Sequence, residues 1–209
     1  PKEAAADAVA TVPPSFSHAP EFVQKVTARL LAEEGDLMPV SAIPLDGCWP
    51  TGTARFEKRN IALEIPTWDA SICIQCNKCA MVCPHAAIRA KIYPANELAG
   101  APTGFASTAF KSKDFPDQKY TIQVAAEDCT GCSICVQVCP AKDKTNPRHK
   151  AIDMTPVRDV RERERQRFDA FLALPEVDRA AVAKLDVKGT QLLQPLFEFS
   201  GACSGCGET

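Results

Sequence analysis

CIQCNKCAMVCP occupies residues 73–84 of the chain, and CTGCSICVQVCP occupies residues 129–140. Both stretches follow the pattern C-x2-C-x2-C-x3-C-P. This is the ligand spacing of proteins that bind two [4Fe–4S] clusters, in which the fourth cysteine of each run binds the cluster of the other run. The spacing therefore predicts a chain that carries electrons and whose two metal sites are interlocked.

The same spacing predicts which cysteine binds which cluster. Three thiolates can come from one loop because they recur every third residue, so that the loop wraps around the cluster. The fourth cysteine follows after about one helical turn and points away from its own loop. We therefore assign Cys73, Cys76, Cys79 and Cys139 to cluster one, and Cys129, Cys132, Cys135 and Cys83 to cluster two.

Disulfide bonds and structural zinc fit the cysteines less well than clusters do. Disulfides of a secreted protein fit poorly, because the chain has an odd number of cysteines, 11, and most of them are tightly spaced. Structural zinc also uses C-x2-C pairs, but it normally combines two separated pairs. The pattern favours clusters, and clusters indicate a reducing, cytoplasmic setting.

Composition and charge argue against several classes of protein. The chain has 209 residues and a formal net charge of -2, with both signs mixed along it, so nothing indicates nucleic-acid binding. No apolar run approaches the roughly 18–20 residues of a membrane span, and residues 1–12 lack the layout of a signal peptide. Because the chain does not begin with Met and stops soon after Cys206, we expect an excerpt of a longer polypeptide.

The segments around the cysteines predict an α+β fold. Alternating strand patterns occur at residues 88–93, 120–124 and 151–154. Each half of the region reads as a cysteine loop, a short helical turn and a strand. We expect the bacterial-type dicluster ferredoxin fold, with helical and extended flanks.

Two helices are predicted in the flanks. The first covers residues 17–34 and ends at Gly35. Its apolar face is predicted to contain Phe22, Val26 and Leu30. The second begins with Thr155 as its N-cap and Pro156 in its first turn, and ends before Pro175. Its many charges indicate a solvated face with mixed ion pairs, and a docking surface for an acidic partner is the alternative.

Residues near the cysteines have predicted supporting roles. Gly131 and Asn77 are expected at comparable tight positions of the two loops, because both residue types tolerate positive φ. The insertion at residues 85–128 is longer than a two-cluster domain needs, and we expect it to be functional or to cover another surface. An apolar shell that excludes water from the clusters is predicted from Ile72, Ile74, Val82, Ile134, Val136 and Val138.

No other group of residues predicts catalysis. The histidines, His18, His85 and His149, are scattered. His85 follows Cys83-Pro84, so a hydrogen bond near a cluster is the alternative to an ordinary packed or surface role. Cys48 has no partner at metal spacing, and we expect it to be a buried free thiol.

The sequence resembles the ferredoxin-type segment of the pyruvate:ferredoxin (flavodoxin) oxidoreductases. The matching stretches are residues 39–44, 52–53, 56–62 and 83–89, the second cysteine run, and residues 199–209. The resemblance implies a homodimeric enzyme that contains thiamine diphosphate, Mg2+ and a third [4Fe–4S] cluster. Such an enzyme converts a 2-oxoacid, usually pyruvate, and coenzyme A into acetyl-CoA and CO2, and passes electrons singly to ferredoxin or flavodoxin.

The last cysteine pair acquires a role only through this resemblance. On its own, C-x2-C at Cys203 and Cys206 fits a cluster, zinc or thiol redox chemistry. The resemblance implies that both residues supply half of the ligands of the third cluster, nearest thiamine, and that their partners follow Thr209. A self-standing ferredoxin-type carrier with extensions is the competing hypothesis. Cys203 and Cys206 argue against it, because a free carrier has no use for half of a cluster site.

Together these observations predict five segments. Residues 1–37 are a linker and helix from a preceding domain, and 38–66 are an extended linker that contains Glu57-Lys58-Arg59-Asn60. Residues 67–156 form the ferredoxin-like domain. Residues 157–198 are a helical connector, and 199–209 are the truncated start of the thiamine-binding domain.

Overall fold

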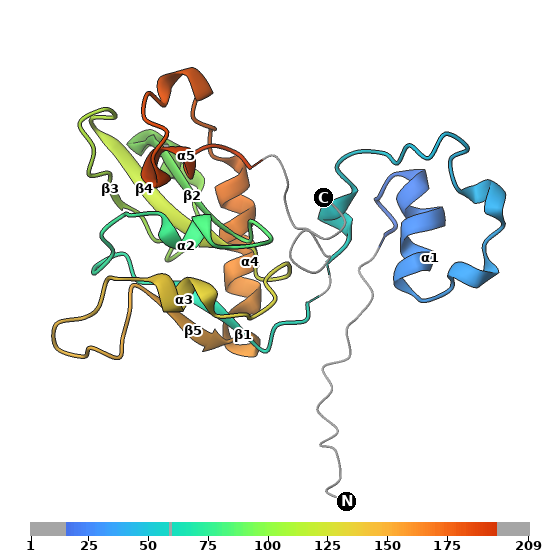
Figure 1. The fold of residues 1–209 in the computed structure, drawn as a ribbon, viewed down its shortest axis with the longest axis horizontal. Coiled ribbons are helices and arrows are strands. Elements are labelled where there is room, and N and C mark those ends of the chain that lie inside the picture. The colour runs from blue at the N-terminus through green and yellow to red at the C-terminus, as the bar shows by residue number, and fades with distance from the viewer. Residues whose placement is uncertain (1–15, 59, 196–209) are drawn as a thin grey trace, which may run out of the picture. The chain divides into compact units, whose positions relative to one another are not determined.

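The computed structural model describes residues 16–58 and 60–195. The chain divides into two compact units, Pro1–Lys58 and Arg59–Thr209. The division falls inside the segment 38–66 that was predicted as an extended linker. The second unit contains both cysteine runs (Figure 1).

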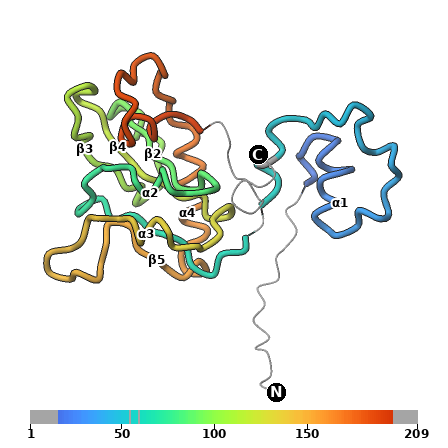
Figure 2. Tube along the Cα trace, viewed as in Figure 1, coloured from blue at the N-terminus to red at the C-terminus, as the bar shows by residue number. Residues whose placement is uncertain are grey.

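The first unit is built on one helical stretch followed by tight turns (Figure 2). Its π-helix η1 (Val23–Thr27) continues directly into α1 (Ala28–Leu31). The helix ends at Leu31 rather than at Gly35, because Glu33 adopts a positive φ of 60° and Gly35 starts the short 3-10 helix η2 (Gly35–Leu37). Its buried face contains Val23 and Val26, whereas Leu30 is 44% exposed. The remaining turns are the 3-10 helices η3 (Val40–Ala42) and η4 (Thr53–Phe56).

The second unit contains two small antiparallel sheets. In one sheet β1 (Glu64–Trp68) pairs with β5 (Ile152–Pro156), with Ile65 opposite Thr155. In the other, β4 (Gln118–Val124) lies between β2 (Ile88–Pro94) and the short β3 (Thr108–Ala109). The predicted strands therefore form, and the mixed helix and sheet agrees with the predicted α+β class. The sequence patterns did not indicate β1 or β3.

The strand order shows that the unit is an internal duplication. Trp68 at the end of β1 and Val124 at the end of β4 each lie five residues before the first cysteine of the following run. Each run then forms a loop and a short helix, α2 (Lys78–Met81) or α3 (Ile134–Val138), and leads to a strand. The strand before each run pairs with the strand after the other run. This pairing interlocks the halves and brings the two cysteine loops together.

A long helix supports the strands on the side away from the loops (Figure 1). This helix, α4 (Val157–Ala173), ends before Pro175 as predicted. The predicted start is wrong by one residue: the N-cap is Pro156 and not Thr155, because both residues still belong to β5. Its inner face buries Phe168 and Phe171. Ion pairs within the helix, such as Arg165 with Glu162 at 2.8 Å, agree with the solvated charged face expected from the sequence. The chain continues through the 3-10 helix η6 (Arg179–Ala181) to α5 (Val187–Thr190).

Strand β2 is buried on both faces, although its sequence alternates apolar and charged residues. Arg89 and Lys91 are 5% and 1% exposed. Lys91 Nζ lies 2.7 Å from Glu176 Oε1, donates to the carbonyl of Leu174 and sits over the Phe171 ring. Buried charges need such partners. The pairing therefore fastens the connector after α4 to the strand that follows the first cysteine run.

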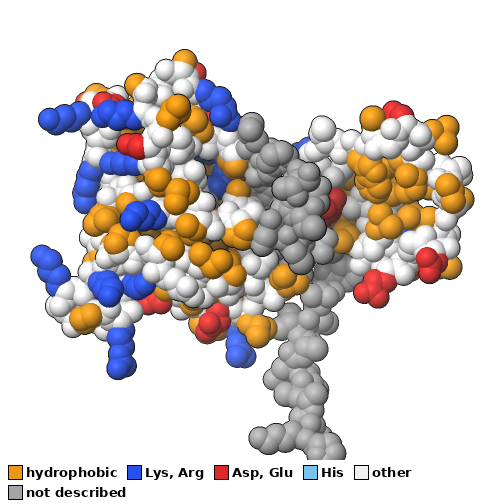
Figure 3. All heavy atoms as spheres, in the orientation of Figure 1, with side chains coloured by type: hydrophobic (Ala, Val, Ile, Leu, Met, Phe, Trp, Pro, Cys, Tyr) orange, Lys and Arg blue, Asp and Glu red, His pale blue; other side chains and the backbone are white. Residues whose placement is uncertain are grey.

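The surface of the second unit is rich in lysine and arginine side chains (Figure 3). One loop, residues 141–150, follows the second cysteine run and is closed by an antiparallel bridge between Lys142 and Lys150.

Within residues 16–58 and 60–195, no helix has both the length and the apolar character needed to cross a membrane.

Candidate metal centre

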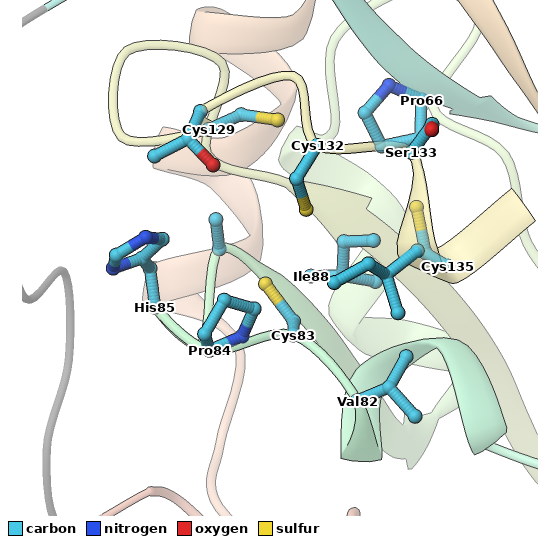
Figure 4. Close-up of a pocket in the computed structure, with 13 residues that line it drawn as sticks. Pro66, Val82, Cys83, Pro84, His85, Ile88, Cys129, Cys132, Ser133 and Cys135 are labelled. Atoms are coloured by element: carbon cyan, nitrogen blue, oxygen red, sulfur yellow. The ribbon is translucent and has the colours of Figure 1, made fainter. Parts of the chain in front are cut away.

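Four of the eight run cysteines surround one cavity. Cys83, from the end of the first run, and Cys129, Cys132 and Cys135, from the second, line this small cavity (Figure 4). The rest of the lining is mostly apolar and includes Pro66, Val82, Ile88 and Ile134. The structure thus brings together the four residues that the sequence assigns to cluster two.

The other four run cysteines also lie close enough to influence one another. Burial raises the pKa of Cys73, and the nearby Cys76 and Cys139 raise it further. Burial also raises the pKa of Cys79, with additional contributions from Cys73 and Cys76 and a smaller one from Cys135. Cys139 from the second run therefore lies with the first run, and the two groups of thiols adjoin.

Thiols in the second group are similarly hard to ionise. Burial raises the pKa of Cys129 to about 11 and that of Cys135 to about 12, and Cys83 and Cys132 contribute to both shifts. Thiolate is the form that binds metal. Because metal coordination deprotonates thiols, occupation of this site is expected to release protons.

Both loops follow the same backbone path. Gln75 and Asn77 have φ values of 59° and 57°, and Gly131 and Ser133, at the same positions of the second run, have 73° and 58°. The amides of Gln75 and Gly131 donate to the first sulfur of their runs, Cys73 Sγ at 3.3 Å and Cys129 Sγ at 3.4 Å. The positive φ predicted at Asn77 and Gly131 is confirmed, but Gly131 corresponds to Gln75, and Asn77 corresponds to Ser133.

The insertion covers the first loop. The buried Gln75 side chain donates to the carbonyl of Ala109 at 2.8 Å and accepts from the amide of Lys111 at 2.8 Å. These partners lie in and beside β3, after the 3-10 helix η5 (Ala95–Gly100). The insertion at residues 85–128 therefore covers a surface, as expected, and that surface is a cysteine loop.

A second buried amide fixes the same loop from two other elements. Asn77 Oδ1 accepts from the Tyr120 hydroxyl of β4 at 2.5 Å, and its amide nitrogen donates to the carbonyl of Lys188 in α5 at 2.9 Å. The connector after α4 thus reaches the first cysteine loop.

The predicted apolar shell forms only in part. Ile74 is 54% exposed, so it does not exclude water from the clusters. Ile134, although 40% exposed, lines the cavity of the second group together with Val82, as predicted. Ile65, Ala87 and Ile88 are buried nearby and supply apolar cover instead.

The arrangement of donors fits a group larger than one ion. Zinc needs its thiolates about 2.3 Å from a common centre. In the described part of the chain, no three Cys, His, Asp or Glu side chains converge closely enough to hold a single metal ion. Four sulfurs around a mostly apolar cavity, with loop amides turned toward sulfur, suit a [4Fe–4S] cluster.

The remaining candidate residues have different surroundings. His85 is buried and lines the cavity of the second group. Cys48 is exposed, which contradicts the expected buried thiol: its turn projects into solvent and is held by Asp46. His18 is exposed, and His149 lies 3.0 Å from Asp69. Cys203 and Cys206 lie outside the described residues.

Sequence patterns missed two contributors to the site. Trp68 lies beside Cys73, where its indole lowers the pKa of that thiol against the larger effect of burial. It also packs edge-on against Tyr120. Gln75 is the other. Its only sequence signal is its position in the first run, which is equivalent to that of Gly131 in the second. A long side chain at a position that favours glycine indicates that contacts hold the side chain in place.

Comparison with known proteins agrees with this geometry. Residues 72–142 match the model of the 4Fe-4S double cluster binding domain, and residues 9–62 match a domain of unknown function named EKR. The central part of the chain is thus a double-cluster iron–sulfur domain, and the two-cluster prediction is supported.

Similar proteins identify the family more narrowly. The chain is 56% identical over 94% of its length to a pyruvate-flavodoxin oxidoreductase of Nostoc sp., and 55% identical over 94% to a probable pyruvate-flavodoxin oxidoreductase of Escherichia coli. It is 46% identical over 98% to a pyruvate:ferredoxin oxidoreductase of Moorella thermoacetica. It spans only 16–17% of these relatives. The chain belongs to the pyruvate-flavodoxin oxidoreductase family, of which it matches one segment.

Proposed function

We propose that this chain is the electron-relay segment of a 2-oxoacid oxidoreductase, with two [4Fe–4S] clusters held in a dicluster ferredoxin fold. The observation that carries the proposal is the grouping of Cys83 with the cysteines of the second run around one cavity. The assigned ligands are Cys73, Cys76, Cys79 and Cys139 for cluster one, and Cys129, Cys132, Cys135 and Cys83 for cluster two.

The protein's own groups would control what the clusters do. Each bound cluster accepts and releases one electron at a time. The loop amides of Gln75 and Gly131 donate toward sulfur and thereby favour the reduced, more negative state. Crossed ligation and the paired strands hold the two sites at a fixed, short separation, which suits sequential one-electron transfer.

The activity of the intact protein is a further part of the proposal. By the names of its relatives, it would oxidise a 2-oxoacid, most simply pyruvate, and deliver the electrons to flavodoxin or ferredoxin. Thiamine diphosphate with Mg2+, coenzyme A and a homodimeric assembly come from the family resemblance, and so does the third cluster with Cys203 and Cys206 as ligands. A self-standing carrier is less well supported, because the relatives extend far beyond this segment.

Metal analysis under anaerobic conditions tests the relay. We expect about eight irons and eight sulfides per chain, and a spin-coupled EPR signal from two clusters after reduction. Zinc in place of iron would contradict the proposal, and so would about four irons.

Substitution of a single cysteine tests the crossed assignment. Cys83→Ala should damage the cluster that is held by Cys129, Cys132 and Cys135. Cys48→Ala is the matched control, since the Cys48 thiol is exposed and takes no part in either group. If Cys83→Ala removed only the cluster of its own run, ligation would be uncrossed.

A further inference from the structure

His85 is placed at the cavity of the second thiol group although it belongs to the first run. It follows Cys83-Pro84 and is only 6% exposed. It lines the same cavity as Cys83, Cys129 and Cys132, and Figure 4 draws its ring next to Pro84, at the edge of the labelled residues. The imidazole is therefore enclosed on the side where cluster two would sit.

One nitrogen of this ring has no partner. Nδ1 of His85 is buried and makes no hydrogen bond within the described part of the chain. An unsatisfied polar atom in an apolar cavity is costly, so native proteins almost always pair such atoms. The surrounding side chains offer apolar surface, four cysteine sulfurs and the hydroxyls of Thr130 and Ser133. The four sulfurs are the most numerous side-chain acceptors of this cavity.

The duplication shows that this polar group is specific to one half. The residue that follows Cys139-Pro140 is Ala141, at the position that corresponds to His85. Ala141 is also buried, at 7% exposure, and it has no side-chain donor. Packing at this position is therefore possible without an imidazole, and the second half manages without one.

We propose that His85 donates an N–H···S hydrogen bond from Nδ1 to the sulfur of cluster two and so raises the reduction potential of that cluster alone. The proposal rests on the cluster assignment given above. Reduction adds negative charge to a cluster, and a hydrogen bond to a more negative acceptor is stronger. Hydrogen bonds to sulfur are among the factors that set cluster potentials. Neutral imidazole has one N–H, and the proposal assigns this hydrogen to Nδ1, the nitrogen without a partner.

Potentiometric titration of the intact protein, followed by EPR at one fixed pH, tests this role. His85→Leu keeps an apolar side chain of useful size and removes the donor. We expect about a tenfold shift of one reduction equilibrium toward the oxidised state, a fall of about 59 mV for one electron. The other midpoints should not move. His85→Gln, which keeps an N–H donor, should recover most of the shift.

Two controls separate tuning from a structural effect. His18→Leu makes the same chemical change at an exposed residue of the first unit and should leave every midpoint in place. Iron content should stay at the unsubstituted level in both His85 variants. Unchanged midpoints in His85→Leu would overturn the inference, and so would iron loss in either variant, which would make His85 a ligand or a packing residue. Lack of clusters in the unsubstituted protein would instead refute the proposed function.

Discussion

The two cysteine loops share their spacing and backbone path, but they are held in different ways. In the first loop, Gln75 and Asn77 are each 1% exposed, and their side chains bond to the insertion, to β4 and to α5. In the second loop the equivalent residues are Gly131 and Ser133, and neither makes a side-chain hydrogen bond within the described residues. Cys132 of that loop is exposed.

This difference distinguishes the features that both halves of the repeat share from those that only the first loop has. The repeat supplies the ligands, the positive-φ positions and the paired strands. The segment around β3 and the connector after α4 lie outside the repeat, and both bond to the first loop through these amides. Since solvent exposure and hydrogen bonding set cluster potentials, we expect the two clusters to differ in potential despite identical ligand sets.

Removing the Asn77 side chain should have the largest effect on stability. Asn77→Ala leaves the Tyr120 hydroxyl and the Lys188 carbonyl without a partner in a buried place, and we expect a loss of about 3 kcal/mol. Ser133→Ala is the matched control, because it has the same backbone conformation and no comparable bonds, and it should cost less than about 1 kcal/mol. Anaerobic urea unfolding of the cluster-loaded protein measures both. Equal losses would show that the amide bonds do not distinguish the loops.

Gln75→Gly should release the insertion from the first loop. Glycine accepts the positive φ of this position, so the substitution removes the side-chain bonds to Thr108, Ala109 and Lys111 without straining the backbone, at a cost of about 2 kcal/mol. Hydrogen exchange should become faster at the amides of residues 108–111. Exchange within residues 152–156 is the internal reference, since this strand belongs to the other sheet. If residues 108–111 kept their protection, other contacts would hold the insertion in place.

The sequence could predict the repeat but not these contacts, and the reason is physical. Cysteine spacing is local, and so are the alternating patterns of β2, β4 and β5, so the grouping of the cysteines and these strands could be predicted directly. Strand β1 was missed because it contains Pro66 and its pairing partner lies 84 to 92 residues away. The shell prediction failed at Ile74, because sequence proximity to a cysteine does not say which way a loop residue points. Gln75 looked ordinary, since its partners lie more than 30 residues further on.

A glycine substitution tests the opposite loop. Gly131 has φ of 73°, and a Cβ there would lie 3.1 Å from the carbonyl oxygen of Glu64. Gly131→Ala should therefore cost about 1–2 kcal/mol from the left-handed backbone alone. Gly100→Ala is the control, because a Cβ at Gly100 meets nothing within 4 Å, and it should be nearly neutral. If Gly131→Ala left the free energy of unfolding unchanged, the backbone of the second loop would be able to shift, and this loop would be more deformable than the first.

The smallest expected effect is a pH dependence of the free energy of unfolding, and it involves neither cysteine loop directly. His149, in the loop after the second run, bridges Asp69 at 3.0 Å and Asp153 at 3.5 Å, and Asp143 lies near enough to feel its charge. The hydrogen bond to Asp69 is the main reason that the pKa of His149 is raised above 6.5. A raised pKa means that the protonated form is favoured by folding. Its contribution is thus complete below about pH 6.5 and disappears as the pH rises through the higher folded-state value.

Unfolding midpoints in urea at pH 5.5, 6.5 and 8.5 measure this contribution when the protein is compared with His149→Gln. The two proteins should differ most at pH 5.5 and converge at pH 8.5. The bridge joins the segment just before the first loop to the loop just after the second, so it strengthens both halves together. Its loss should therefore lower the stability of the whole unit without increasing hydrogen exchange in one cysteine loop more than in the other. A constant difference at all three pH values would show that protonation of His149 is not coupled to folding.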